Sequence, residues 1–212
     1  MTDSRPPEFT GLAELGAATV HEAYGRRGAL PSAIKPIDRS FRLCGPAFTV
    51  LCPPADNLWI HRAVYAARPG DVLVVGVRGG YTEAGYWGEI LSQAALARRL
   101  GGLVLEGGVR DVDQIAGLGF PVFAANVCLR GTSKEPTGDG RLGEPVRIGE
   151  VTVHPGDAVV ADADGVVVVE AARIAAVATA SRTRREQEQT ILDDLRRGAT
   201  TLELLGLAAD SS

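Results

Sequence analysis

Apolar and polar residues follow one another along the middle of the chain in blocks that predict alternating strands and helices. Three continuous apolar runs have the pattern of strands buried on both faces: Val72–Val75, Leu103–Leu105 and Phe120–Phe123. The segments between them space their apolar residues as helices do, over about 88–100 and 111–118, and Gly107-Gly108 would form the turn before the second helix. A strand–helix–strand–helix–strand order is typical of a layered α/β fold with parallel strands.

The first quarter of the chain predicts shorter elements. Residues 1–9 are expected to form a loose N-terminal arm, and Leu12–Tyr24 one or two short helices. Proline and glycine separate two further strand-like runs, Phe41–Leu43 and Ala47–Cys52. The next helix would begin after Asp56 and Asn57, which are both suitable N-cap residues.

The last third predicts a loop, short strands and a long helix. Residues 130–149 are rich in glycine, proline and charge, so we expect a long loop. Residues 151–169 look like short strands joined by turns, and a polar helix follows over about 174–197. No linker divides the chain, so we expect a single α/β domain over 1–212 with a C-terminal helical segment over 174–207.

Composition excludes several classes of protein. The 212 residues carry 22 basic and 26 acidic side chains, a net charge of −4, without a basic stripe, which argues against a nucleic-acid-binding protein. Three cysteines without paired spacing argue against a disulfide framework or a four-cysteine zinc site. Neither an N-terminal apolar segment nor an 18-residue apolar run is present, so we expect a cytoplasmic protein without a membrane partner.

Two short segments carry the best candidates for chemistry. If a helix starts at Gly88, the first backbone N–H groups after it have no acceptor within the helix and can bind a carboxylate. Arg110 and Asp111 follow a predicted buried strand, where α/β proteins place ligands, and this pair suits a carboxylate and a divalent cation. A structural alternative stays open, because Asp111 and Gln114 have the spacing of a capping box and Glu89 suits a helix N-terminus.

The three histidines have no metal-ligand spacing. His21, His61 and His154 lie far apart in the sequence, and we expect each to be a surface or core residue.

The segment GEILSQAALARRLGGLVLEGGVRDVDQIAGLGFPVFA resembles the signature region of the RraA-like superfamily. DNLWIHRAVYAARPGDVLVV, RGTSK, VTVHPGDAVVADADGVVVV and LRRGATTLELLGL continue the resemblance in the expected order, from about residue 12 to 207. That superfamily includes the class II 4-hydroxy-4-methyl-2-oxoglutarate (4-carboxy-4-hydroxy-2-oxoadipate) aldolases. The resemblance implies a layered α/β/α fold of the swivelling type, in trimers or hexamers with sites at subunit interfaces.

The resemblance also implies how substrate would bind. In the aldolases twenty residues lie between an acidic residue, usually Asp, and an Arg-Asp pair, and twenty residues lie between Glu89 and Arg110 here. Arg110 would hold the carboxylate and keto oxygen of a 2-oxo acid. The backbone amides after Gly88, those of Ile90 and Leu91, would hold the pyruvyl carboxylate.

The metal site implied by the resemblance is centred on Asp111. Asp111 would bind Mg²⁺ or Mn²⁺, mostly through water, with Glu89 near the metal-bound waters. The family motif continues to an acid where this chain has Gln114, which could contact a metal-bound water but lacks the negative charge. A glutamate from a neighbouring subunit's C-terminal helix would also approach; we assign this role to Glu188, with Glu186 as the alternative.

The activity implied is a metal-dependent retro-aldol cleavage of a 4-hydroxy-2-oxo acid. Pyruvate would be released through a metal-stabilised enolate, with oxaloacetate decarboxylation as a side activity. Neither Lys35 nor Lys134 lies in a strand-end motif suited to a Schiff base. Two alternatives are a lyase acting on a different 2-oxo acid and a non-enzymatic regulator that binds ribonuclease E. The regulators typically lack the aspartate of the Arg-Asp pair, so Asp111 favours an enzyme.

Overall fold

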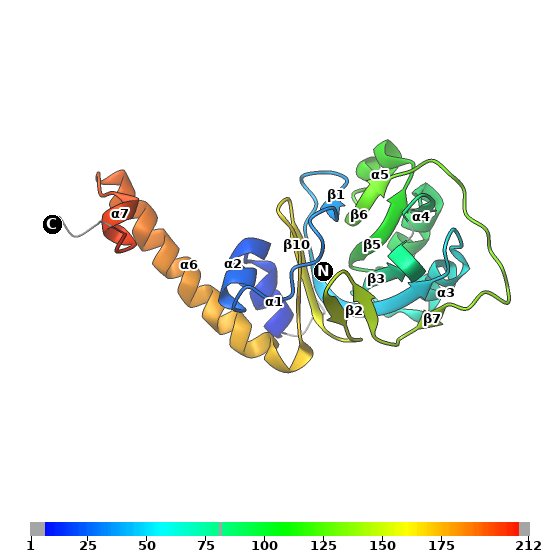
Figure 1. Cartoon of the computed structure of the whole chain (residues 1–212), viewed down its shortest axis with the longest axis horizontal. Helices are drawn as coiled ribbons and strands as arrows, with labels where there is room; N and C mark the ends of the chain where they lie inside the picture. Colours follow the sequence, from blue (N-terminus) through cyan, green and yellow to red (C-terminus); the bar gives the residue numbers. More distant parts are fainter. Residues whose placement is uncertain (1–6, 81, 208–212) are drawn as a thin grey trace.

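One mixed sheet organises the chain, and the computed structural model describes it over residues 7–80 and 82–207 (Figure 1). The strands are β1 (Lys35–Pro36), β2 (Leu43–Cys52), β3 (Val72–Val77), β4 (Gly85–Trp87), β5 (Gly102–Val109), β6 (Val122–Val127), β7 (Arg141–Leu142), β8 (Val146–Ile148), β9 (Val151–Val153), β10 (Ala158–Asp162) and β11 (Gly165–Val169). The α-helices are α1 (Pro7–Ala13), α2 (Ala17–Ala23), α3 (Leu58–Ala66), α4 (Glu89–Ala97), α5 (Val112–Leu118), α6 (Ile174–Arg196) and α7 (Thr201–Leu204).

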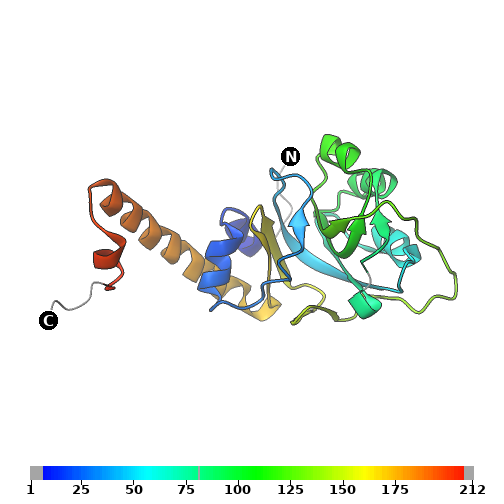
Figure 2. The ribbon, with the colours of Figure 1, turned by 45° about the horizontal axis from the view of Figure 1, so that its top comes forward.

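The strand order confirms the predicted parallel core. The main path of the sheet runs β1-β6-β5-β3-β2-β10-β11, with β4 added on β5 and β7 on β2, whereas β8 and β9 form a separate hairpin. β2, β3, β5 and β6 are parallel, and β3 is buried along its whole length. β1 also contacts β11, so the sheet curls toward a barrel (Figure 2).

Helices cover the sheet in two groups. α3 packs on β2 and β3 and contacts α4, which in turn contacts α5. α1 and α2 pack against the β10 side of the sheet, and the first half of α6 lies on them (Figure 1). The layered α/β fold with a C-terminal helix is thus confirmed. None of the helices in the described residues is both long and apolar enough to span a membrane.

Two expectations about strands were wrong. The runs at Phe41–Leu43 and Ala47–Cys52 belong largely to a single strand, β2, which continues through Pro46. Pro46 fits because the strand changes partner there: residues 43–46 pair with β10, and the parallel pairing with β3 begins at Ala47. The Gly107-Gly108 pair does not form a turn but lies inside β5. A Cβ on Gly108 would stand only 2.7 Å from the Ala84 carbonyl oxygen, so the glycine permits close approach of two chains.

Other element boundaries also differ from those expected. α1 begins at Pro7, so it takes the last residues of the expected arm, and Phe9 is buried; residues 1–6 lie outside the described part of the chain. The long loop after β6 is interrupted by β7 and β8 within the 130–149 range. The DADG segment is the predicted turn between β10 and β11, and Asp162 accepts a hydrogen bond from the Ala17 N–H at the start of α2.

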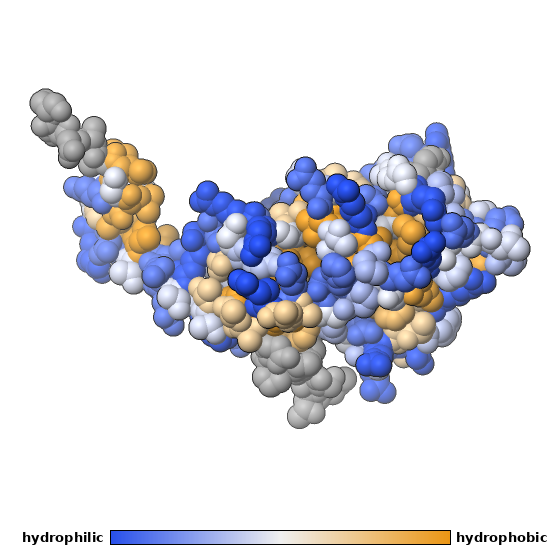
Figure 3. All heavy atoms as spheres, turned by 60° about the horizontal axis from the view of Figure 1, so that its bottom comes forward, coloured by the Kyte–Doolittle hydropathy of each residue, from blue (hydrophilic) through white to orange (hydrophobic). Residues whose placement is uncertain are grey.

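The C-terminal helix extends well beyond the sheet. Its buried residues, Ile174, Val177, Ala178 and Ser181, all lie in its first third. Arg184 and Arg185 still contact Glu22 and the Glu14 carbonyl, and beyond them the rest of α6 and α7 projects away from the body as an arm, which we define as residues 186–207 (Figures 1 and 2). Leucines exposed on the arm give it an apolar surface near its tip (Figure 3): Leu192, Leu202, Leu205 and Leu207.

Candidate active site

A cleft of about 170 Å³ opens where strands of the sheet reach their carboxyl ends. This edge is where open α/β sheets place ligands, because the strand-to-helix connections meet there. The lining residues come from four segments of the chain: Asn57 and His61; Gly85, Tyr86, Trp87, Gly88, Ile90 and Leu91; Arg110 and Asp111; Gly131, Thr132 and Lys134.

Arg110 and Asp111 directly follow β5, as the sequence predicted. Their side chains are 47% and 40% exposed, and the Arg110 Nε lies 3.8 Å from the Asp111 Oδ2. Both side chains are therefore available to a ligand in the cleft. Asp111 adopts a left-handed backbone conformation, with φ of 58°, which aspartate tolerates better than most residues.

The side chain of Asp111 does not cap its own helix. Asp111 occupies the N-cap position of α5 but makes no capping hydrogen bond there, so the capping-box interpretation with Gln114 was wrong. Its Oδ2 instead accepts a hydrogen bond of 3.1 Å from the Glu89 N–H, at the start of α4. The carboxylate thus connects the end of β5 to the first turn of a different helix.

Gly88 makes this junction possible. A Cβ on Gly88 would stand 2.4 Å from the Asp111 Oδ2 and 3.3 Å from the Arg110 Cγ. Any larger residue would therefore displace the two side chains that define the site.

The N-terminus of α4 points a set of backbone donors into the cleft. The helix starts at Glu89, and the N–H groups of its first turn have no acceptor within the helix. Glu89 donates to Asp111, whereas Ile90 and Leu91 line the cleft with their N–H groups available to an anion. Ile90 is 78% exposed, which is unusual for an apolar side chain and leaves this corner open.

Asn57, His61 and Lys134 also line the cleft, although none of them was predicted as a site residue. Asn57 lies at the N-cap position of α3, donates to the Tyr86 carbonyl at 2.8 Å, and keeps its buried Oδ1 without a protein partner. His61, expected at the surface or in the core, lines the cleft one turn further on, facing Lys134 from the loop after β6. Burial, then the Lys134 charge, lowers the pKa of His61. The Asp56-Asn57 pair before α3 and the RGTSK segment were the sequence features from which these lining residues could have been predicted.

Three predicted site residues do not line the cleft. The side chains of Glu89 and Gln114 are exposed and do not line the cleft, although the backbone N–H of Glu89 donates to Asp111. Glu188 lies on the projecting arm and forms a 2.8 Å ion pair with Arg184 of the same helix. Since α6 runs away from α4 and α5 (Figure 1), Glu188 does not contribute to the site of its own chain.

Comparison with known proteins identifies the family to which the chain belongs. A protein of Halalkalibacterium halodurans named "Putative 4-hydroxy-4-methyl-2-oxoglutarate aldolase" is 34% identical over 161 residues, covering 76% of this chain and 75% of that protein. A crystal structure of an uncharacterized Pseudomonas syringae protein has a TM-score of 0.81 at 26% identity, covering 96% and 99% of the two chains. The RNA-processing inhibitor RraA of Thermus thermophilus has a TM-score of 0.65 at 25% identity, covering 72% and 91%. The RraA-like (Aldolase/RraA) family model matches residues 17–168, and the chain belongs to that family.

Proposed function

We propose that the protein is a divalent-metal-dependent lyase that cleaves a 4-hydroxy-2-oxo acid and releases pyruvate. One observation carries the proposal: Arg110, Asp111 and the free N–H groups of α4 converge on one cleft. The name of the H. halodurans relative supports 4-hydroxy-4-methyl-2-oxoglutarate or 4-carboxy-4-hydroxy-2-oxoadipate as the substrate.

The chain's own residues would orient the 2-oxo acid. The guanidinium of Arg110 would bind the carboxylate and keto oxygen, since arginine presents paired donors to such a group. The N–H groups of Ile90 and Leu91 would hold the pyruvyl carboxylate. The Arg110 guanidinium, next to the keto oxygen, would also stabilise the negative charge that develops there when the C3–C4 bond breaks.

The donor set fits a cation that is bound largely by water. Mg²⁺ typically takes one or two carboxylates and keeps several waters, and Asp111 offers one partly exposed carboxylate in the cleft. The described residues contain no group of three or more acidic, histidine or cysteine side chains that could enclose a metal. Asp111 would therefore hold Mg²⁺ or Mn²⁺ with Gln114 near its waters, and the bound cation would supply a Lewis acid for the keto group.

Glu89 is the proposed base. Glu89 is exposed and lies between the lining residues Gly88 and Ile90, and its carboxylate would accept the proton of the C4 hydroxyl, directly or through water. Loss of that proton allows the C3–C4 bond to break and leaves a pyruvate enolate, which is then protonated. Oxaloacetate decarboxylation would produce the same enolate and is expected as a side activity.

The proposal includes a second copy of the chain. Glu188 would reach a neighbouring subunit's Asp111 in a homotrimer or hexamer, because it lies on an arm that leaves its own domain. A neighbour would also cover the exposed leucines of the arm.

The test is pyruvate release from oxaloacetate and from 4-hydroxy-4-methyl-2-oxoglutarate, with Mg²⁺ or with EDTA. We expect metal-dependent release from both, reduced by about 10²-fold or more in Asp111→Ala because the cation loses its protein ligand. Asp113→Ala, two positions further on and outside the cleft, is the matched control. Release from oxaloacetate alone would point to another 2-oxo acid. Release no greater than that of Asp111→Ala would refute the enzyme proposal and favour a regulator.

A further inference from the structure

A second carboxylate, outside the Arg110–Asp111 pair, lies next to the cleft and is almost completely buried. Asp56 is 2% exposed and lies two residues before the start of α3. Its Oδ1 accepts a 2.9 Å hydrogen bond from the Leu58 N–H. Its Oδ2 accepts from the Ser133 hydroxyl at 2.8 Å and from the Glu135 N–H at 2.6 Å. A buried carboxylate is costly unless donors surround it, and here three do.

Two of these donors flank Lys134. The backbone adds two further bonds on the same stretch: the Ser133 N–H donates to the Ala55 carbonyl at 2.8 Å, and the Asn57 N–H donates to the Ser133 carbonyl at 3.2 Å. The residues before and after Lys134 are thus both held to the start of α3. Burial opposes ionisation of Asp56, but its hydrogen bonds outweigh this and lower the pKa, so the carboxylate is charged near neutral pH.

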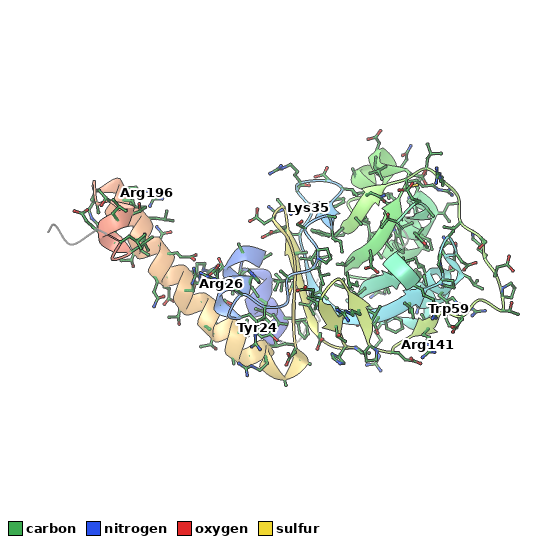
Figure 4. All side chains as sticks on the ribbon, in the orientation of Figure 1. Tyr24, Arg26, Lys35, Trp59, Arg141 and Arg196 are labelled. Atoms are coloured by element: carbon green, nitrogen blue, oxygen red, sulfur yellow. The ribbon has the colours of Figure 1, made fainter. Side chains whose placement is uncertain are left out.

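The rest of the loop is attached elsewhere on α3. Trp59 donates from Nε1 to the Gly138 carbonyl at 3.0 Å, and its ring packs against Gly140, at the edge of the domain opposite the arm (Figure 4). Trp59 is not a lining residue of the cleft. Asp56 is therefore the side chain that fixes the part of the loop that lines the cleft.

Lys134 is the functional group in that part of the loop. It lines the cleft with Thr132, and its charge contributes to the lowered pKa of His61. A lysine side chain has high conformational entropy, and a cation on an unconstrained loop would be spread over many positions.

We propose that Asp56 is a positioning residue: it clamps the backbone on both sides of Lys134, so that this cation stands at a defined place in the cleft and binds the anionic substrate. The substrate class rests on the proposed function, but the clamp itself does not. Removing the clamp should weaken substrate binding through Lys134 and leave the groups at Arg110 and Asp111 in place.

Asp56→Asn is the sharpest variant. The amide keeps an oxygen for the Leu58 N–H, but its NH₂ group cannot accept from the Glu135 N–H. We expect KM for oxaloacetate and for 4-hydroxy-4-methyl-2-oxoglutarate to rise by about 10-fold, with kcat changed by less than about 3-fold. Ser133→Ala, which removes one of the two clamp donors, should give a smaller rise in KM.

A double-mutant cycle with Lys134→Met separates positioning from general destabilisation. If Asp56 acts through Lys134, Asp56→Asn should not raise KM further in the Lys134→Met background. The control is Asp38→Asn, since the exposed Asp38 Oδ1 accepts from both the N–H and the hydroxyl of Ser40, away from the cleft. An equal rise in KM in both backgrounds would refute the proposal.

Hydrogen exchange tests the clamp without relying on activity. The amide hydrogens of Ser133 and Glu135 should exchange at least about 10-fold faster in Asp56→Asn than in the wild type, and at the wild-type rate in Asp38→Asn. Unchanged exchange would overturn the clamp even if the enzyme is active. If no pyruvate is released by the wild type, the proposed function fails, and exchange alone decides whether Asp56 holds the loop.

Discussion

At the scale of single residues, the candidate site depends on one position without a side chain. Gly88 lies between the last residue of β4 and the first of α4, and it packs against both Arg110 and Asp111. Sequence analysis identified Gly88 as the start of the helix. The contact with Asp111 could not be predicted, because it joins residues more than twenty positions apart.

We expect Gly88→Ala to reduce pyruvate release by about 10²-fold, because the added Cβ displaces Asp111 and Arg110 from their places in the cleft. Gly117→Ala is the control: it lies inside α5, a Cβ there meets nothing within 4 Å, and it should stabilise the helix by about 0.5–1 kcal/mol. Steady-state kinetics and urea unfolding of both variants provide the measurements. Wild-type activity in Gly88→Ala would contradict this account of the site.

The charge state of His61 reports on the position of Lys134. Burial is the larger cause of its lowered pKa and the Lys134 charge the next, so Lys134→Met should raise the pKa of His61 toward its usual value of 6.5. The neutral imidazole would then protonate at a higher pH than in the wild type. An NMR titration of His61 checks this, with His154 as the internal reference. A pKa of His61 that stays the same would place Lys134 away from it.

At the scale of elements, the predicted alternation of strands and helices is confirmed, and the errors concern glycine and proline. Pro46 and Gly107-Gly108 look like chain breaks in the sequence, because both residue types are common in turns. Inside this sheet they have other roles. Pro46 lies where β2 changes its partner strand, and Gly108 lets the backbone of neighbouring segments approach β5. Only the positions of the neighbouring strands and segments distinguish these roles from that of a turn.

Gly108→Ala tests the close approach at β5. The added Cβ would meet the Ala84 carbonyl oxygen at 2.7 Å and the Asn126 Oδ1 at 2.5 Å, and at least the first contact is with backbone that cannot rotate away. We expect the free energy of unfolding to fall by about 1–3 kcal/mol, as for other overpacked cores. Urea unfolding measures the loss. Unchanged stability would mean that β4 and β5 can separate at no cost.

At the scale of the whole molecule, the body and the arm have different roles. The buried residues of α6 end at Ser181, so the arm, residues 186–207, adds no buried side chain to the core of its own domain. The tip of the arm, where Arg196 lies, stands at the far end of the molecule from Trp59 of α3 (Figure 4). Exposed leucines on such an extension are typical of a surface that binds another chain.

Deleting residues 186–212 tests the role proposed for the arm. We expect the domain to stay folded, with the midpoint of thermal unfolding of the monomeric unit changed by no more than about 2–4 °C, because no buried side chain of α6 is lost. We also expect the mass of the full-length protein, measured by light scattering, to be a multiple of 22.2 kDa. The number of subunits calculated from the mass should fall on deletion. A full-length chain that is already monomeric would refute the proposed contribution of Glu188.

Patterns along the chain were sufficient to predict the α/β class, the parallel core, the long polar helix and the positions of Gly88, Arg110 and Asp111. Those features depend on local periodicity, and on residue types whose chemistry is apparent wherever they occur. Three-dimensional packing was needed to show that Asp111 bonds to α4 and not to its own helix, that Asn57, His61 and Lys134 line the same cleft, and that Glu188 lies away from its own domain. These relationships involve segments distant in the chain, and the close packing of the sheet determines which of them meet.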